Sequence, residues 1–302
     1  MIGGCRASLA GSVGVVGVIL LLLGSGAIAF GAPGASATRV ALTGRPPSLP
    51  AFNITFAANS TAEVEELIAD HGYIGPGDSF DLVSGNPQRS DPINVSSINA
   101  WATMLRATYP GAAIYAHTAG LANYALLAEG ATTTISGLFY DYEPGYETEF
   151  TTNFTRTLAN FENATKIAHA HGFESIAYPT GKGLADYPGY SEWDYAEVAA
   201  EVDGEVIQSQ RYCEFGTASF AANVSAGLRE FVASEGIRLP TFQITIGPRT
   251  NGTGWAVRPA AAYDCARVLA EDDQHTLYLW WNPSANADVL EFLQDIGRRP
   301  AI

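Results

Sequence analysis

The chain has 302 residues, of which 47% are hydrophobic, 16% charged and 11% aromatic. This composition excludes a disordered chain, a collagen-like repeat and a coiled coil, and it predicts a folded globular protein. Lysine and arginine total 16 against 31 aspartates and glutamates, so the formal net charge is -15. A surplus of negative charge argues against nucleic acid and anionic membrane surfaces as partners.

The N-terminal segment has the pattern of a secretory signal peptide. Residues 1–12 carry one charged side chain, Arg6, and residues 13–30 are almost wholly apolar, with small residues after them. A charged start, an apolar stretch and small residues at the cleavage site are the three parts of such a signal. We therefore predict that residues 1–37 are a signal peptide.

The end of this signal lies at one of two sites, because A-x-A patterns finish at Ala29 and at Ala37. An uncleaved membrane anchor is the alternative, since the apolar stretch approaches the roughly 20 residues that span a bilayer. Residues 38–50 contain three prolines and are predicted to be a linker. Residues 51–302 are predicted to form a single domain.

The asparagines agree with export. Seven of the thirteen lie in N-x-S/T sequons, where chance would give about two, and this sequon is the acceptor for N-linked glycans. We expect a secreted glycoprotein, or one held at the cell surface; a merely threonine-rich surface is the alternative. Asn53 looks like a strand position and is not expected to be modified. The predicted acceptors are Asn59, Asn94, Asn153, Asn163, Asn223 and Asn251.

The cysteine content also fits an exported protein in an oxidising compartment. Removal of the leader removes Cys5 and leaves Cys213 and Cys265, an even pair. A disulfide between them is expected. Two separate buried thiols are the alternative, because spacing alone does not fix the geometry that a disulfide needs.

Short β-branched and aromatic runs alternate with amphipathic helical stretches from Phe52 onward. Such alternation implies parallel strands with right-handed crossovers, and eight units in about 250 residues fit a closed barrel. We predict an α/β fold, a single (β/α)8 TIM barrel. A doubly wound open sheet is the alternative, although no G-x-G-x-x-G or P-loop motif follows the first strand. The predicted strands are residues 53–57, 80–83, 113–116, 135–141, 174–178, 205–210, 241–246 and 276–281.

The fourth predicted strand ends in two acidic residues, Asp141 and Glu143. Side chains alternate along a strand, so both share a face with Phe139. The active site of a TIM barrel lies at the carboxyl ends of its strands, and we expect both carboxylates to point into that mouth. Two like charges this close raise each other's proton affinity, which suits one of them to general acid catalysis. An ion pair with Arg211, or acidic loop residues without a chemical role, are the alternatives.

Residues 137–143 resemble the fourth-strand signature of family 18 glycoside hydrolases, the chitinase-like enzymes, whose pattern is D-G-x-D-x-D-x-E. Gly137, Asp141 and Glu143 match, whereas Ser136 and Phe139 stand where the first two aspartates would be. The resemblance implies that Glu143 protonates the glycosidic oxygen and that Asp141 orients the substrate's acetamido group, whose oxygen attacks with retention. Because Phe139 cannot accept a hydrogen bond from Asp141, altered proton shuttling or weak or absent activity is also implied. Hyaluronidase-like and phage-lysozyme-like barrels carry a similar inward D-x-E.

The ends of other strands are predicted to bind the sugar. The resemblance implies that Tyr212, after the sixth strand, hydrogen-bonds the acetamido group, and that a tryptophan of the eighth strand forms the floor of the site. Trp281 is favoured over Trp280 as the inward member of that pair. Aromatic rings beside polar groups suit sugars, which present apolar C–H faces. The predicted substrate-binding residues are Tyr178, Gln208, Gln210, Trp280, Trp281 and Trp193.

Other chemistries find little support. The sequence has no H-E-x-x-H and no Cys/His group with zinc-ligand spacing, so we expect neither metal nor cofactor. His117, after the third predicted strand, either lines the mouth or is an ordinary core histidine. No G-x-S-x-G motif favours an esterase.

We therefore predict a secreted, retaining glycoside hydrolase that acts on an oligosaccharide or polysaccharide containing N-acetylhexosamine. Catalysis is assigned to Glu143, Asp141 and Tyr212. A catalytically inactive, lectin-like barrel is the alternative, and a cell-surface structural protein held by its leader is a third.

Overall fold

The structure is a computed structural model that describes residues 49–299 apart from 87–90, 186, 234–239, 248–255 and 281–285. The predictions for the signal peptide, for most of the linker, for Asn251 and for Trp281 therefore lie outside the described residues.

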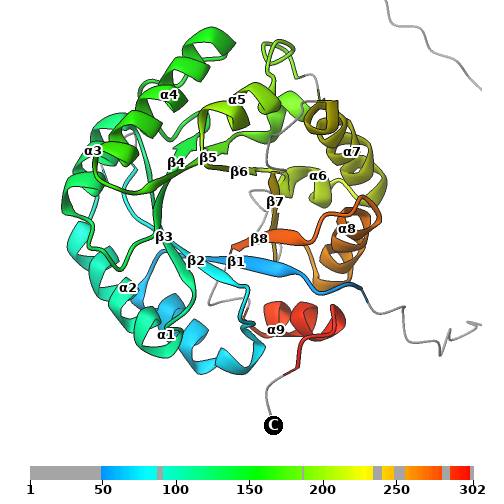
Figure 1. Cartoon of the computed structure of the whole chain (residues 1–302). Helices are drawn as coiled ribbons and strands as arrows, with labels where there is room; N and C mark the ends of the chain where they lie inside the picture. Colours follow the sequence, from blue (N-terminus) through cyan, green and yellow to red (C-terminus); the bar gives the residue numbers. More distant parts are fainter. Residues whose placement is uncertain are drawn as a thin grey trace, which may run out of the picture. The chain divides into compact units, whose positions relative to one another are not determined.

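Eight parallel strands form a closed barrel, in which each strand pairs with the next and β8 closes onto β1 (Figure 1). The predicted TIM barrel is confirmed, and the open sheet is excluded. The strands are β1 (Asn53–Ala58), β2 (Ser79–Val83), β3 (Ala113–Ala119), β4 (Gly137–Tyr142), β5 (Glu174–Pro179), β6 (Gly204–Ile207), β7 (Thr241–Thr245) and β8 (Thr276–Trp280).

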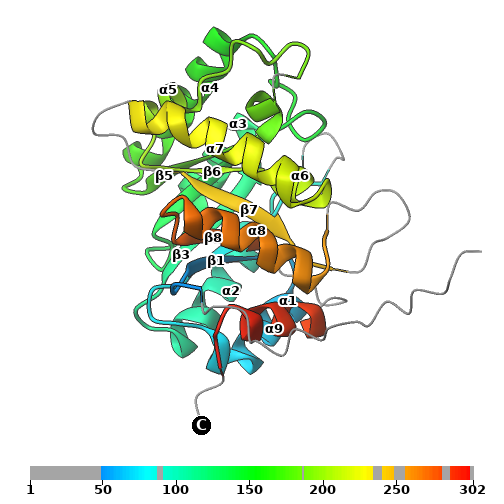
Figure 2. The same ribbon diagram turned by 90° about the vertical axis from the view of Figure 1, so that its right-hand side faces the viewer.

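Helices form an outer ring around the strands (Figure 1), and the side view shows α7 and α8 next to each other on the outside of the barrel (Figure 2). The α-helices are α1 (Thr61–Ala69), α2 (Val95–Thr108), α3 (Leu121–Gly130), α4 (Phe154–Ala170), α5 (Tyr195–Glu201), α6 (Gln210–Glu214), α7 (Thr217–Ala233), α8 (Pro259–Glu271) and α9 (Asn286–Asp295). Two short 3-10 helices are η1 (His71–Tyr73) and η3 (Gly181–Ala185).

Local signals in the sequence set the helix ends. Ser60 caps α1 by accepting the backbone N–H of Glu63 at 3.3 Å, and the Glu63 carboxylate accepts the N–H of Asn59, which makes a reciprocal cap. At its C-terminal end, α4 stops at Ala170, and Gly172 follows with φ of 80°. Glycine adopts this left-handed conformation without the strain that a Cβ would cause.

Alternation along β4 sorts its side chains between two cores. Tyr140 faces outward and packs edge-on against Phe161 of α4, with ring centroids 5.7 Å apart. Phe139 faces inward and fills the barrel interior together with Tyr178 and Tyr278. The predicted division of faces on this strand is confirmed.

The sixth strand is shorter than predicted. β6 ends at Ile207, an isolated bridge follows at Gln208, and α6 begins at Gln210. Ser209 leaves the extended conformation, with φ -103° and ψ 3°, and its hydroxyl donates to the carbonyl oxygen of Gln243 at 2.8 Å. The predicted strand over residues 205–210 is therefore too long, because Gln210 belongs to a helix.

A disulfide joins Cys213 of α6 to Cys265 of α8, with Cα atoms 6.0 Å apart. Both residues are buried. The alternative of two separate thiols is excluded, and α6 is tied to α8 covalently. Within the described part of the chain, no helix combines the length and apolarity needed to cross a bilayer.

Candidate active site

A cavity of about 940 Å³ opens at the carboxyl ends of the strands, which we call the mouth of the barrel. Its wall includes residues at or just after the ends of all eight strands, from Asn59 after β1 to Trp280 on β8. The loops of a parallel barrel converge at this end, and it is where barrel enzymes place their active sites.

Asp141 and Glu143 both line this cavity. Asp141 is the penultimate residue of β4 and is 7% exposed, whereas Glu143 follows the strand and is half-buried. The side-chain amide of Gln208 donates to Asp141 Oδ1 at 3.1 Å. Both acids of the D-x-E pair therefore reach the same hollow, as strand alternation predicts.

The pKa of Asp141 is raised, and burial is the main cause. His117 acts in the opposite direction, while the negative charge of Asp81 adds to the rise. The direction is the one expected from the sequence, but the physical reason differs. Removal of the carboxylate from water matters more than a neighbouring carboxylate two positions along the strand.

A row of buried polar groups lies behind Asp141, and most of it was not predicted from the sequence. His117 Nδ1 lies 2.7 Å from Asp81 Oδ2, and the hydroxyl of Tyr278 donates to the same oxygen at 2.6 Å. His117 Nε2 lies 3.8 Å from Asp141 Oδ2. The row crosses the barrel interior from β8 through β2 and β3 to β4, and its histidine and Asp81 are at most 1% exposed.

Burial alone lowers the pKa of His117, but the carboxylates of Asp81 and Asp141 outweigh it and raise the pKa to about 10. The ring is therefore an imidazolium at neutral pH. Of the two alternatives for His117, the residue lines the mouth, although it lies inside β3 rather than after it. Among the residues that the structure describes, no group of three or more His, Cys, Asp or Glu side chains is arranged to hold a metal ion.

Phe139 occupies the inner position two residues before Asp141, where the family motif has an aspartate. Its ring is stacked on His117, with centroids 5.6 Å apart and planes inclined by 16°, and is 2% exposed. This position thus puts an apolar ring behind His117 and offers no hydrogen-bond acceptor.

Most of the predicted binding residues meet at the cavity. The hydroxyl of Tyr178 donates to Gln243 Oε1, and that of Tyr212 donates to the carbonyl oxygen of Gly181 at 2.7 Å. A hydroxyl has a single proton, and Tyr212 already donates it to Gly181, so it is not free to be donated to an acetamido group. The predicted residues that line the cavity are Tyr178, Gln208, Gln210, Tyr212 and Trp280.

Trp193 corrects the prediction, because it belongs to the outer core and is not part of the cavity wall. Its ring is 6% exposed and packs against Tyr142, Phe150 and Tyr190, and its Nε1 donates to the carbonyl oxygen of Thr152 at 3.1 Å. The loop after β5 thus turns this ring toward the segment before α4 rather than over the mouth.

Trp280 holds the inward position at the end of β8. It packs against the interior cluster that contains Tyr278 and lines the cavity, whereas Leu277 and Leu279 belong to the outer core. The preference for Trp281 as the inward member of the pair is therefore corrected to Trp280. Trp281 itself lies outside the described residues.

A third carboxyl lies near the pair and was also missed. Glu147, in the loop between β4 and α4, has an exposed fraction of 0%. Burial raises its pKa to about 11, and the charges of Asp141 and Glu143 contribute to the rise. Glu147 is therefore a neutral acid at pH 7. A buried loop residue has no periodic pattern, so the sequence offered no signal for it.

Arg211 also lines the cavity, at the start of α6. Its guanidinium lies 5.7 Å from the ring of Tyr187 and 5.4 Å from that of Phe215. The cation beside Asp141 is instead His117.

The predicted glycan acceptors lie mostly at the surface. Asn223 is half-buried, and its Nδ2 donates to the carbonyl oxygen of Ser219 at 2.6 Å. Asn53 begins β1, as expected of a strand position. The exposed acceptors are Asn59, Asn94, Asn153 and Asn163.

The fold is shared with known glycoside hydrolase barrels. The glycoside hydrolase domain of PgaB (BpsB) from Bordetella bronchiseptica aligns with a TM-score of 0.53 at 11% identity, over 77% of this chain and 94% of that one. The spore cortex-lytic enzyme SleL of Bacillus megaterium aligns with a TM-score of 0.56 at 8% identity, over 85% and 76%. Active domain 2 of a thermostable chitinase from Pyrococcus furiosus, complexed with chito-oligosaccharides, aligns with a TM-score of 0.54 at 11% identity, over 85% and 100%.

No protein-family model and no curated protein sequence matches this chain. The structural likeness therefore shows a fold shared with chitinases and other glycoside hydrolases, and it shows the fold alone.

Proposed function

We propose that this chain is a glycoside hydrolase that cleaves an N-acetylhexosamine-containing glycan with retention of configuration, and that Glu143 is its general acid and then its base. The observation that carries the proposal is the placement of Asp141 and Glu143 together on the wall of a large cavity at the mouth of the barrel. The same fold in glycoside hydrolases and chitinases supports it.

The chemistry follows from the exposure of the two acids. Half-buried Glu143 reaches the cavity and, when protonated, donates to the glycosidic oxygen as the bond to the leaving sugar breaks. The acetamido oxygen of the substrate attacks the anomeric carbon, forming an oxazolinium ion. The Glu143 carboxylate then takes a proton from the water that opens this ring, which restores the acid and retains the configuration.

Asp141 has a different task, because it is more deeply buried and already fixed by Gln208. Its carboxylate accepts the N–H of the acetamido group and balances the positive charge that develops on the oxazolinium. The aromatic rings of Tyr178 and Trp280, beside the amides of Gln208 and Gln243, provide the mixture of apolar and polar surface that a sugar requires.

A glycan-binding barrel without activity is the second candidate, and one observation favours it. Phe139, two positions before Asp141, offers it no hydrogen-bond acceptor, and its ring is buried in the barrel interior against His117. Such a protein would keep the cavity and the aromatic wall while lacking turnover.

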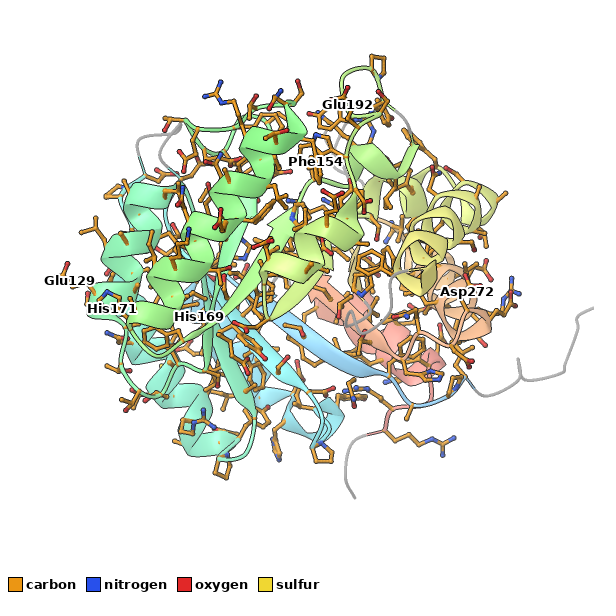
Figure 3. All side chains as sticks on the ribbon, turned by 45° about the horizontal axis from the view of Figure 1, so that its top comes forward. Glu129, Phe154, His169, His171, Glu192 and Asp272 are labelled. Atoms are coloured by element: carbon orange, nitrogen blue, oxygen red, sulfur yellow. A yellow bond between two sulfur atoms is a disulfide. The ribbon has the colours of Figure 1, made fainter. Side chains whose placement is uncertain are left out.

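The test is a fluorogenic chitobioside assay on wild type and on Glu143→Gln, with binding of chito-oligosaccharides measured by calorimetry. Loss of a general acid is expected to lower kcat by about two to four orders of magnitude while binding persists. Glu192→Gln is the matched control, because Glu192 is an exposed acid in the loop after β5 (Figure 3) and should leave kcat unchanged. Binding without turnover in wild type would favour the lectin-like candidate.

The protein is further proposed to work outside the cytoplasm. The disulfide between Cys213 and Cys265 supports this location, since such bonds persist in oxidising compartments. Exposed sequon asparagines agree with a glycosylating route. N-terminal sequencing of the exported protein, together with its mass before and after glycan removal, tests the leader and the acceptors directly.

A further inference from the structure

Four side chains, from strands β2, β4 and β5, enclose His117. Asp81 of β2 contacts its Nδ1 and Asp141 of β4 faces its Nε2, at 2.7 and 3.8 Å. Phe139 stacks on one face of the ring, and Tyr178 of β5 meets it edge-on with centroids 4.8 Å apart. A histidine packed this tightly has a fixed orientation.

The two ring nitrogens have different partners. The Nδ1 hydrogen bond to Asp81 is reinforced from behind, because Tyr278 donates to the same carboxylate oxygen. Nε2 is buried and, among the described residues, has no hydrogen-bond partner. Its distance of 3.8 Å to Asp141 Oδ2 is an ion-pair distance rather than a hydrogen bond.

We propose that His117 is the positioning residue of this site: its imidazolium, oriented by Asp81 and Tyr278, holds Asp141 as a carboxylate turned toward the acetamido group of the substrate. This inference rests on the proposed function and deepens it, because it supplies the partner that Phe139 cannot provide. His117 does not touch the reacting atoms; it acts through Asp141.

Charge explains why the arrangement works. A carboxyl as buried as Asp141 favours its neutral form, which could not balance an oxazolinium ion. The fixed cation on one side and the Gln208 amide on the other both favour the charged form. Besides Asp141, the titratable groups that contact His117 are Asp81 and Tyr178, and Tyr278 lies behind Asp81. Asp81 favours the protonated histidine.

The experiment compares wild type with His117→Gln and Asp81→Asn. Both variants should lower kcat by about 100-fold, the cost of a misplaced catalytic group. His117→Gln should also move the acid limb of the pH profile of kcat/KM upward by about 1 to 3 pH units, because Asp141 loses the cation that favours its charged form. His169→Gln is the matched control: His169 pairs with Asp203 at 2.7 Å on the exposed end of α4, and its loss should change neither quantity (Figure 3).

A lower kcat with an unmoved acid limb in His117→Gln would mean that His117 only packs, and it would overturn the proposal. Asp81→Asn keeps the imidazole in place and removes the carboxylate that orients it, so an unchanged kcat in this variant would also overturn the proposal, even if His117→Gln fails to fold.

Histidine-selective ¹⁵N NMR on the wild-type protein gives a readout independent of substrate. Both ring nitrogens of His117 should stay protonated at pH 8, and a neutral ring at pH 7 would overturn the proposal. If wild type turns over no N-acetylhexosamine substrate, the proposed function fails, and this spectrum alone decides whether the buried imidazolium exists.

Discussion

Replacing Glu147 by glutamine should make the folded protein less sensitive to rising pH. Glu147 is completely buried, and its carboxyl is neutral in the fold because burial raises its pKa to about 11. In the unfolded chain the same group ionises near its ordinary value of 4.5. Between these values the folded state holds one proton more than the unfolded state, so stability is lost as the pH rises.

The size of this loss depends little on the exact pKa in the fold. At pH 7 the buried carboxyl remains protonated for any folded-state pKa well above 8, so the unfolded chain sets the change. From pH 5 to pH 7 the free energy of unfolding should fall by about 2.5 kcal/mol on account of Glu147 alone. Glutamine has nearly the same shape and no titration, so Glu147→Gln should lack this component.

Urea unfolding of wild type and Glu147→Gln at pH 5, 6 and 7 measures the difference. Other buried acids titrate in both proteins and cancel in the comparison. Glu129→Gln on the exposed end of α3 is the matched control and should follow wild type at every pH (Figure 3). If the curves of Glu147→Gln and wild type stay parallel, Glu147 is ionised in the fold, and the charge balance described around Asp141 is wrong.

Four further changes have definite expected outcomes. Replacing Cys213 and Cys265 by alanine opens a loop of 52 residues, which should cost about 4 kcal/mol and lower the Tm by about 10 °C in calorimetry; an unchanged Tm would refute this. Gln208→Leu removes the amide that fixes Asp141 and should lower kcat/KM about 10- to 100-fold. An unchanged kcat/KM would mean that Gln208 only lines the cavity. Trp280→Ala should raise KM about tenfold with little change in kcat, and a selective fall in kcat would contradict a stacking role. Glu205→Gln, at a buried carboxyl of β6 whose pKa burial raises, should flatten the pH dependence of stability in the same urea series, and a steeper dependence would exclude this account.

The barrel was predictable because its signals are local and repeated. Strand alternation and helix caps recur along the chain, and the alternation on β4 correctly separated Phe139 and Asp141 from Tyr140. Side chains stop alternating where Ser209 leaves the extended conformation, so the sixth strand, predicted to continue to Gln210, was too long.

The candidate site was only partly predictable, because its other members meet across strands. Asp81 and His117 are 36 positions apart and become neighbours only through the register of β2 and β3. Their inward positions on two adjacent strands were a usable signal once parallel pairing was assumed. Trp193 shows the converse limit: an aromatic-rich loop near the mouth packs as readily against the outer core as over the cavity.

The configuration of the first product tests the central claim most directly. Proton NMR of a β-linked chito-oligosaccharide digest in its first minutes separates the two anomers before they interconvert. If Glu143 is the acid and the acetamido oxygen the nucleophile, the β-anomer should appear first, and Glu143→Gln should release neither. Initial release of the α-anomer, or equal hydrolysis by the variant, would contradict the assignment.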